Sequence, residues 1–193
     1  MNADPLHLAV IIGSTREGRR GPLVAAWAVG QMAERDDITV DLIDLADVGL
    51  PAVFPMEADE HVTAYRRRLA DADAFVVVTP EYNHSAPASL KHAIDLAGAE
   101  WRRKPVAFVS YGGLSGGLRA VEHLRHVFAE LHAVGVRDTV SFHGPWNGFT
   151  DDGQPSEPTS AAQGMKVLLD DLGWWGHALR TARQADLLQA SNW

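Results

Sequence analysis

The chain has 193 residues, of which 46% are hydrophobic and 22% charged, and a formal net charge of −8. This length and composition are typical of a single globular domain, 1–193, and the acidic excess argues against general nucleic-acid binding. The absence of cysteine excludes disulfides, thiolate metal ligands and thiol redox chemistry. Because no apolar run of membrane-spanning length and no secretory signal are present, we expect a cytoplasmic protein without membrane association.

Apolar strands alternate with amphipathic helices along the chain. We expect strands at 8–12, 38–42, 74–79, 106–110 and 136–142, with the second at a sheet edge because its pattern alternates. We expect helices at 22–32, 57–72 and 116–133, and a last helix around Met165, Leu168, Leu169, Leu172 and Leu179. A further helix should begin at the N-cap Ser85, with Pro87 in its first turn, and end at about 97. Loops are expected at 44–56 and 143–158. Five β-α repeats predict an α/β doubly wound parallel sheet. The common order 2-1-3-4-5 would place a ligand crevice between strands one and three.

Three of the loops that link a predicted strand to the next helix carry polar residues or glycines that suit a ligand. The second of these loops, 80–83, follows the most apolar strand. Residues 74–78 contain no polar side chain, which indicates a strand covered on both faces. Ligands of parallel sheets lie beyond the carboxyl ends of such strands, where this chain places Pro80, Glu81, Tyr82 and Asn83. The alternative is a simple turn before a capped helix, with Tyr82 as a partly buried anchor.

The first loop, 13–21, links the first strand to a helix. Its glycines and the following helix N-terminus suit an anion, with Ser14, Thr15 and Arg16 as additional donors. The loop lacks both the Gly-Lys-Ser/Thr ending of a P-loop and the G-x-G-x-x-G dinucleotide spacing, so it predicts a site for one terminal phosphate. The cluster of Arg16, Arg19 and Arg20 also favours a single anion. The alternative is an ordinary glycine-rich turn with solvated arginines.

The third loop, 110–117, has glycine at positions 112, 113, 116 and 117, so a flat ring could lie against its backbone amides. Residues 113–117 also match G-x-S-x-G, the nucleophile elbow of α/β-hydrolases, with His143 or His177 as a possible base. That alternative explains neither of the other two loops, and the chain is short for a hydrolase of that fold.

The three loops together resemble the NADPH-dependent FMN reductase family of flavodoxin-like proteins, which includes quinone, chromate and azo-dye reductases. The resemblance rests on Gly13-Ser14-Thr15-Arg16, on Pro80-Glu81-Tyr82-Asn83-His84-Ser85 followed by Leu90-Lys91-His92-Ala93-Ile94-Asp95, and on the glycines of the third loop. It implies a flavodoxin-like three-layer sandwich. It also implies FMN as cofactor, NADPH or NADH as hydride donor, and a homodimer or homotetramer in which one subunit closes its neighbour's flavin pocket.

By this resemblance, the first loop and the start of the next helix hold the phosphate, while the second and third loops flank the isoalloxazine ring. No side chain is expected to act as a catalytic acid, and no metal site is expected. The residues expected to bind the cofactor are Ser14, Arg16, Arg19, Arg20, Gly21, Pro22, Leu23, Pro80, Glu81, Tyr82, Asn83, Ser110, Tyr111, Gly112, Gly113 and Gly117.

The sequence departs from the family pattern at two positions. Arg19 stands where many members have a phosphate-contacting serine, so it either replaces that serine as a charged donor or points to water. Leu96 stands where many members have a tryptophan, which changes the pocket rim or a subunit contact.

The resemblance implies an enzyme that passes hydride from reduced nicotinamide to flavin and then to a small acceptor such as a quinone or free flavin. The alternative is an electron carrier or FMN-binding module without nicotinamide turnover. Three other features have open interpretations. His84 is either a donor to the acceptor or structural, His123 and His126 are a metal pair or solvated surface, and residues 66–68 are solvated arginines or contain a contact to the 2′-phosphate of NADPH.

Overall fold

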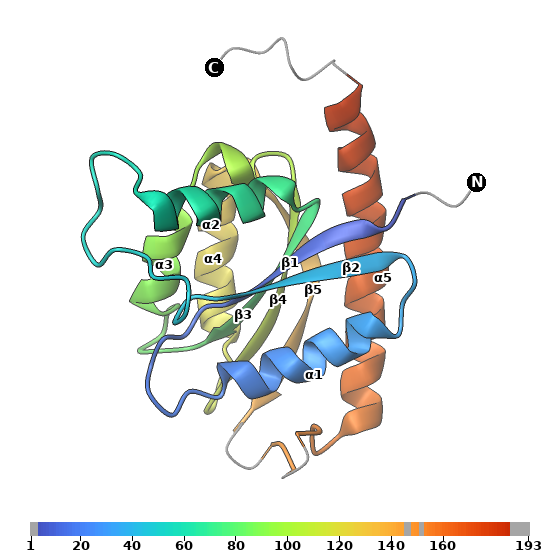
Figure 1. The fold of residues 1–193 in the computed structure, drawn as a ribbon. Coiled ribbons are helices and arrows are strands. Elements are labelled where there is room, and N and C mark those ends of the chain that lie inside the picture. Colours follow the sequence, from blue (N-terminus) through green and yellow to red (C-terminus); the bar gives the residue numbers. More distant parts are fainter. Residues whose placement is uncertain (1–3, 145–147, 151–152, 186–193) are drawn as a thin grey trace.

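Five parallel strands form a sheet in the order β2-β1-β3-β4-β5 in our computed structural model, which describes residues 4–144, 148–150 and 153–185 (Figure 1). This order confirms the fold predicted from the sequence. The strands are β1 (Leu6–Ile12), β2 (Ile38–Asp44), β3 (Ala74–Pro80), β4 (Pro105–Gly112) and β5 (Val134–His143).

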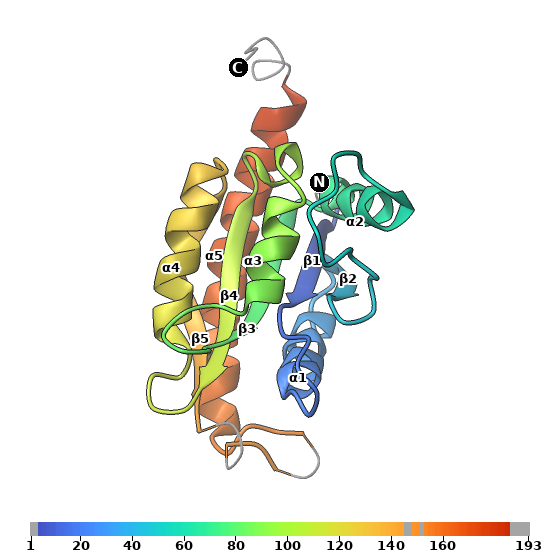
Figure 2. The ribbon, with the colours of Figure 1, turned by 90° about the vertical axis from the view of Figure 1, so that its left-hand side faces the viewer.

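Helices cover both faces of the sheet, which makes the three layers expected of a flavodoxin-like sandwich (Figures 1 and 2). Helices α1 (Gly21–Ala33) and α5 (Pro158–Gln184) pack on one face. Helices α2 (Glu60–Asp71), α3 (Ala88–Asp95) and α4 (Leu118–Glu130) pack on the other, together with the short 3₁₀ helix η1 (Ala99–Trp101). Among the residues described, no helix is both long and apolar enough to cross a lipid bilayer.

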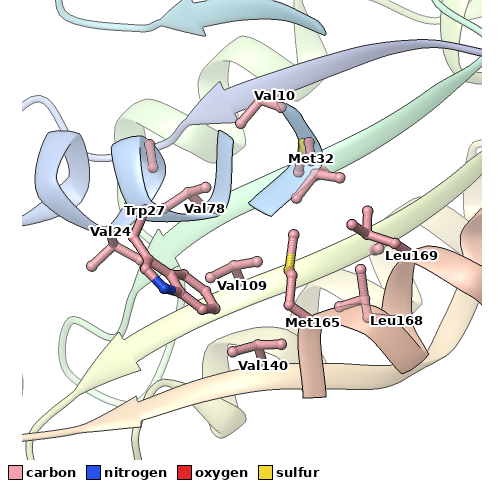
Figure 3. Packing of buried hydrophobic residues seen from close by; sticks show 14 of the residues in the cluster. Val10, Val24, Trp27, Met32, Val78, Val109, Val140, Met165, Leu168 and Leu169 are labelled. Carbon is pink, nitrogen blue, oxygen red and sulfur yellow. The ribbon is translucent and has the colours of Figure 1, made fainter. Parts of the chain in front are cut away.

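The core follows from the alternation of side chains along buried strands. Val76 and Val78 face α1 and α5, while Phe75 and Val77 face the other three helices, so all of β3 is buried. Figure 3 shows the cluster of buried side chains between the sheet and helices α1 and α5. Four strands contribute Val10, Val78, Val109 and Val140, α1 contributes Trp27 and Met32, and α5 contributes Met165, Leu168 and Leu169. Full burial of each such side chain contributes about 1.5–3 kcal/mol.

One predicted helix start is wrong. Ser85 is not an N-cap, because α3 begins at Ala88 after Pro87. The backbone of Ser85 instead exchanges hydrogen bonds with Tyr82, at 2.9 and 3.1 Å. The two intervening residues, Asn83 and His84, have φ values of 48° and 74°, and positive φ at both central residues is the pattern of a type I′ turn. The other elements lie where the sequence predicts them, with ends that differ by a few residues.

A network of charged groups lies at the end of the sheet where β1, β3 and β4 begin. The Asp73 carboxylate accepts from the backbone N–H of His7 and from Arg180 at 3.1 Å each, and from Arg183 at 3.2 Å. The buried Lys104 ammonium donates to the Leu69 and Ala70 carbonyls at the end of α2, at 2.8 and 2.7 Å. Burial, and then the nearby Arg183, lower the pKa of Lys104 to about 8. These contacts tie the starts of β1 and β3 and the segment before β4 to α5 and α2, while the loops described below lie at the other end of the strands.

Candidate functional site

The first, second and third loops meet at the carboxyl ends of β1, β3 and β4 (Figure 2). Here and below, the edge of the sheet means this end of the strands. Parallel strands place these loops together, and side chains join them across the edge. The sequence predicts this meeting, and the hydrogen bonds described next establish it in the structure. Pro80 is the last residue of β3, and 110–112 are the last residues of β4.

The phenol of Tyr82 joins the second loop to the first. Its hydroxyl lies 2.7 Å from the Ser14 hydroxyl, and the Arg16 guanidinium lies 5.9 Å from the centroid of its ring, within cation–π range. Ser14 is fully buried, whereas Thr15 and Arg16 are exposed. Thr15 and Arg16 therefore meet solvent, as does Glu17, whereas Ser14 does not.

Arg19 joins the first loop to the end of β2. Its guanidinium donates to the Ser14 carbonyl at 2.9 Å and forms an ion pair with the carboxylate of Asp44. The hydrogen bond to Asp44 raises the pKa of Arg19 above its already high ordinary value, against the effect of burial. The side chain is only 17% exposed, so it is held by the protein rather than pointing to water. Asp44 is a part of this arrangement that the sequence does not reveal, because it lies 25 residues away.

The Tyr111 hydroxyl lies beneath the start of α1. It is buried and lacks a partner in hydrogen-bonding geometry, and a Cβ atom built on Gly21 would stand 3.1 Å from it. Burial raises the pKa of Tyr111, as does the neighbouring Tyr82, while Ser14 and Arg19 oppose this. The resemblance implies that Tyr111 flanks a ring at the third loop, but the structure places its hydroxyl at the first loop.

Glu81 joins the second loop to the third. Its carboxylate accepts from the Ser115 hydroxyl at 2.5 Å, from the Arg119 backbone N–H at 3.2 Å and from the Arg119 guanidinium at 3.1 Å. Burial raises the pKa of Glu81, but these donors outweigh it and leave the pKa below its usual range. Glu81 is therefore an ionised group that fastens two loops together. The sequence reveals neither partner, because both lie more than thirty residues away.

The third loop is a tight turn that needs glycine at two positions. Gly116 and Gly117 have φ values of 61° and 88°, where residues with a Cβ are strained. The hydroxyls of Ser110 and Ser141 both donate to the Gly116 carbonyl, at 2.9 and 2.8 Å, so Ser110 supports the loop from within. Gly113 is exposed and has open space where a Cβ would stand, which leaves its backbone accessible to a ligand.

The remaining predicted residues lie around these contacts. Arg20 precedes α1 and is half-buried, Pro22 is exposed in the first turn of that helix, and Leu23 is half-buried. Gly112 packs closely against the third loop, and Gly117 is the N-cap of α4. Asn83 is exposed at the tip of the type I′ turn. The structure therefore brings all the predicted residues to one edge of the sheet, although several of their side chains face protein partners.

The side chains on which the alternative interpretations depend contact other protein groups in the structure. Ser115, the nucleophile of the hydrolase alternative, donates to Glu81, while His143 contacts the Leu114 carbonyl at 3.1 Å. His123 contacts the Ser85 hydroxyl at 3.0 Å, and no group of three or more metal-ligating side chains occurs in the described part of the chain. Arg66 donates to the Leu96 carbonyl at 2.6 Å, and Arg68 pairs with Asp41, so both hold α2 in place.

A cavity of about 600 Å³ lies beside the three loops rather than between them. It is formed by β5, the segment before α5 and the first turns of α5, including Ser141, His143, Ser160 and Gly164. Ser141 and His143 form its connection to the third loop. We place the functional site at the loops because that is where ligands lie on a parallel sheet.

The comparisons with known proteins agree with this geometry. A family model described as NADPH-dependent FMN reductase matches residues 6–147. The NAD(P)H-dependent FMN reductase C4B3.06c of Schizosaccharomyces pombe is 40% identical over 130 residues, which are 62% of this chain and 64% of that protein, just under two thirds of its length. An NAD(P)H:quinone oxidoreductase of Solanum tuberosum is 35% identical over 152 residues, 69% of this chain and 74% of that protein.

A solved structure shows the same fold. FerB, a flavoenzyme NAD(P)H:(acceptor) oxidoreductase from Paracoccus denitrificans, has a TM-score of 0.68 at 23% identity, over 88% of this chain and 97% of that chain. The family match covers well over half of the sequence and includes all three loops. The chain therefore belongs to the NADPH-dependent FMN reductase family.

Proposed function

We propose that this chain is an FMN-dependent oxidoreductase that takes reducing equivalents from NADPH or NADH and passes them to a small acceptor such as a quinone or free flavin. The observation that carries this proposal is the meeting of the three loops at the β1/β3 switch point, where flavodoxin-like sheets hold FMN. The names of the fission-yeast and potato relatives support the donor and the class of acceptor.

The first loop fits a phosphate group. Helix α1 has no acidic residue in its first turn, so its N-terminal dipole is free to favour an anion. The exposed Arg16 side chain offers a charged donor, and the buried Tyr111 hydroxyl lacks a partner in the described structure. Arg16, Arg20, the Tyr111 hydroxyl and the N-terminus of α1 would hold the phosphate, while Arg19 and Ser14 shape the loop. The serine seen in many members would thus be replaced by a loop-bracing arginine.

The second and third loops fit a flat ring. Tyr82 and Asn83 would contact the ring from the second loop and the accessible backbone of Gly113 from the third, where Gly112 packs closely against Gly117. FMN, when bound, would supply the hydride chemistry, and these residues would position its ring. The N-terminus of α4 follows the third loop directly, so its dipole would favour negative charge on a ring bound there.

We further propose a homodimer or homotetramer located in the cytoplasm, where NADPH and NADH are available. The loop between β2 and α2 exposes Val53, Phe54 and Met56 at 78%, 56% and 105%, and Leu114 of the third loop is 92% exposed. Exposed apolar groups of this size are typical of protein contacts. Light scattering should give a mass of two or four chains, and a monomer would contradict this part.

Colour and anaerobic reduction test the function. The purified protein reconstituted with FMN should be yellow and should bleach when NADPH or NADH is added without oxygen. A yellow protein that neither nucleotide bleaches would favour the electron-carrier alternative. A protein that binds no FMN would reject both.

A further inference from the structure

The carboxylate of Glu81 is a buried negative charge at the N-terminus of α4. Its side chain is only 8% exposed, and it receives a backbone N–H from the first turn of that helix, at Arg119. The Ser115 hydroxyl supplies a second hydrogen bond. An acid in this position is stabilised by the helix dipole and by charge-assisted hydrogen bonds, so Glu81 stays ionised at neutral pH.

The positive partner of Glu81 lies in a different environment. The Arg119 guanidinium contacts the carboxylate at 3.1 Å, but its side chain is 44% exposed. Water and salt screen an exposed charge more strongly than a buried one. The pair is therefore electrostatically unequal, with its negative member in the protein and its positive member at the surface.

This charge lies inside the proposed cofactor site. Glu81 directly follows the last residue of β3, and its Cβ is 3.5 Å from the position of a Cβ built on Gly112. A ring that contacted Tyr82 and Gly113 would thus lie beside Glu81, because Tyr82 is the next residue in the chain and Gly113 directly follows Gly112. The inference rests on the proposed function in this respect, because it requires FMN at these loops.

Reduction changes the charge of the flavin. The oxidised isoalloxazine ring is neutral, and two electrons with one proton leave one negative charge on it. We propose that Glu81 opposes this charge and lowers the midpoint potential of bound FMN, whereas Arg119 partly offsets the effect. Charge near the ring is one of the ways in which a protein tunes a flavin. A lower potential makes the bound flavin a stronger donor to acceptors and makes its reduction by nicotinamide less favourable.

The test is the midpoint potential of bound FMN in four proteins, measured by equilibration with redox dyes at saturating FMN. Glu81→Gln removes the charge but keeps an acceptor and a similar shape. We expect it to favour the reduced flavin by roughly tenfold, about 30 mV for a two-electron couple. Arg119→Gln should shift the potential in the opposite direction by a smaller amount.

Glu122→Gln is the matched control. Glu122 lies on the same helix and pairs with Arg125, but its side chain is 70% exposed, so its loss should leave the potential unchanged. Opposite shifts from the two members of one ion pair distinguish charge from structure, because loosening the contact between the loops would move both variants in the same direction.

Unchanged potentials in both variants, or shifts of the same sign, would overturn the inference. If Glu81→Gln does not fold, Arg119→Gln decides alone, because Arg119 is at the surface, and an unchanged or raised potential there would overturn the inference. Failure of the proposed function would look different, since the wild-type protein would then bind no FMN or would not be reduced by nicotinamide.

Discussion

The hydroxyl groups of Ser14 and Tyr82 lie 2.7 Å apart, although 68 positions separate them in the chain. Because Ser14 is fully buried, Tyr82→Phe leaves its hydroxyl without this partner, which should lower the free energy of unfolding by about 1–3 kcal/mol. Urea titrations of both single variants and of Ser14→Ala/Tyr82→Phe measure the link. The double variant should lose less unfolding free energy than the two single variants lose together. Additive losses would contradict a direct hydrogen bond between the two hydroxyls.

Arg16→Ala should weaken FMN binding more than riboflavin binding, because riboflavin lacks the phosphate. Loss of a hydrogen bond to a charged group costs about 1.5–3 kcal/mol, which is roughly tenfold to more than a hundredfold in the dissociation constant of FMN. Fluorescence titration with both ligands gives the comparison. Arg67→Ala is the control, because Arg67 is exposed on α2. Equal losses for FMN and riboflavin would show that Arg16 does not contact phosphate.

Gly117→Ala should destabilise the protein strongly, while Gly113→Ala should not. Gly117 has a φ of 88°, and a Cβ there would lie 2.8 Å from the Ser110 Cβ and 2.9 Å from the Tyr111 backbone. Left-handed strain of about 1–2 kcal/mol and overpacking of about 1–3 kcal/mol act together. Gly113 has open space at this position. Thermal unfolding of the FMN-free proteins should separate the two variants, and equal melting temperatures would contradict the loop geometry.

Tyr65 and Tyr111 carry buried hydroxyls that lack a hydrogen-bond partner in the described structure. Each change to Phe should leave the FMN-free protein as stable as before or slightly more stable, because no hydrogen bond is lost. Of the two, Tyr111 lies at the first loop, whereas Tyr65 is on the buried face of α2. Tyr111→Phe alone should therefore weaken FMN binding. Calorimetry and FMN titration of both variants provide the measurements, and equal effects on FMN would argue against this role.

Lys104 should make stability depend on alkaline pH. Burial lowers its pKa from 10.5 to about 8, so between these values the unfolded chain binds more protons than the folded one. Unfolding free energy should accordingly rise from about pH 8 to pH 10.5, and the destabilising effect of the buried charge should be complete below pH 8. The rise in unfolding free energy across this range is at most roughly 3–4 kcal/mol.

Lys104→Met removes this titrating group and keeps much of its apolar stem. Urea titrations across the alkaline range should show a flatter pH dependence for the variant than for the wild type. Parallel curves for the two proteins would mean that the ammonium is not desolvated as the structure indicates.

Local patterns were sufficient to predict the fold and the three loops. The unbroken apolar run of β3 and the alternation of β2 reflect burial on two faces and at a sheet edge, and burial pattern is a property of neighbouring residues. Strand order then follows from the few windings that five β-α units allow, which is why the sequence placed Tyr82, Arg16 and Gly113 at one edge.

Backbone detail was less predictable. The sequence suggests Ser85 as a helix cap because serine commonly has that role, yet two left-handed residues before it turn the chain and delay the helix to Ala88. Left-handed conformations of Asn83 and His84 depend on the hydrogen bonds across the turn, which composition does not reveal.

The sequence by itself determined the sheet, its order and the chemical types gathered at one edge. Only the tertiary structure decided which of those side chains face outward and which hold the loops together, as Glu81 does with Ser115 and Arg19 with Asp44. The physical reason is that an ion pair or hydrogen bond depends on distances of a few ångströms between residues far apart in the chain. No local pattern encodes such a distance.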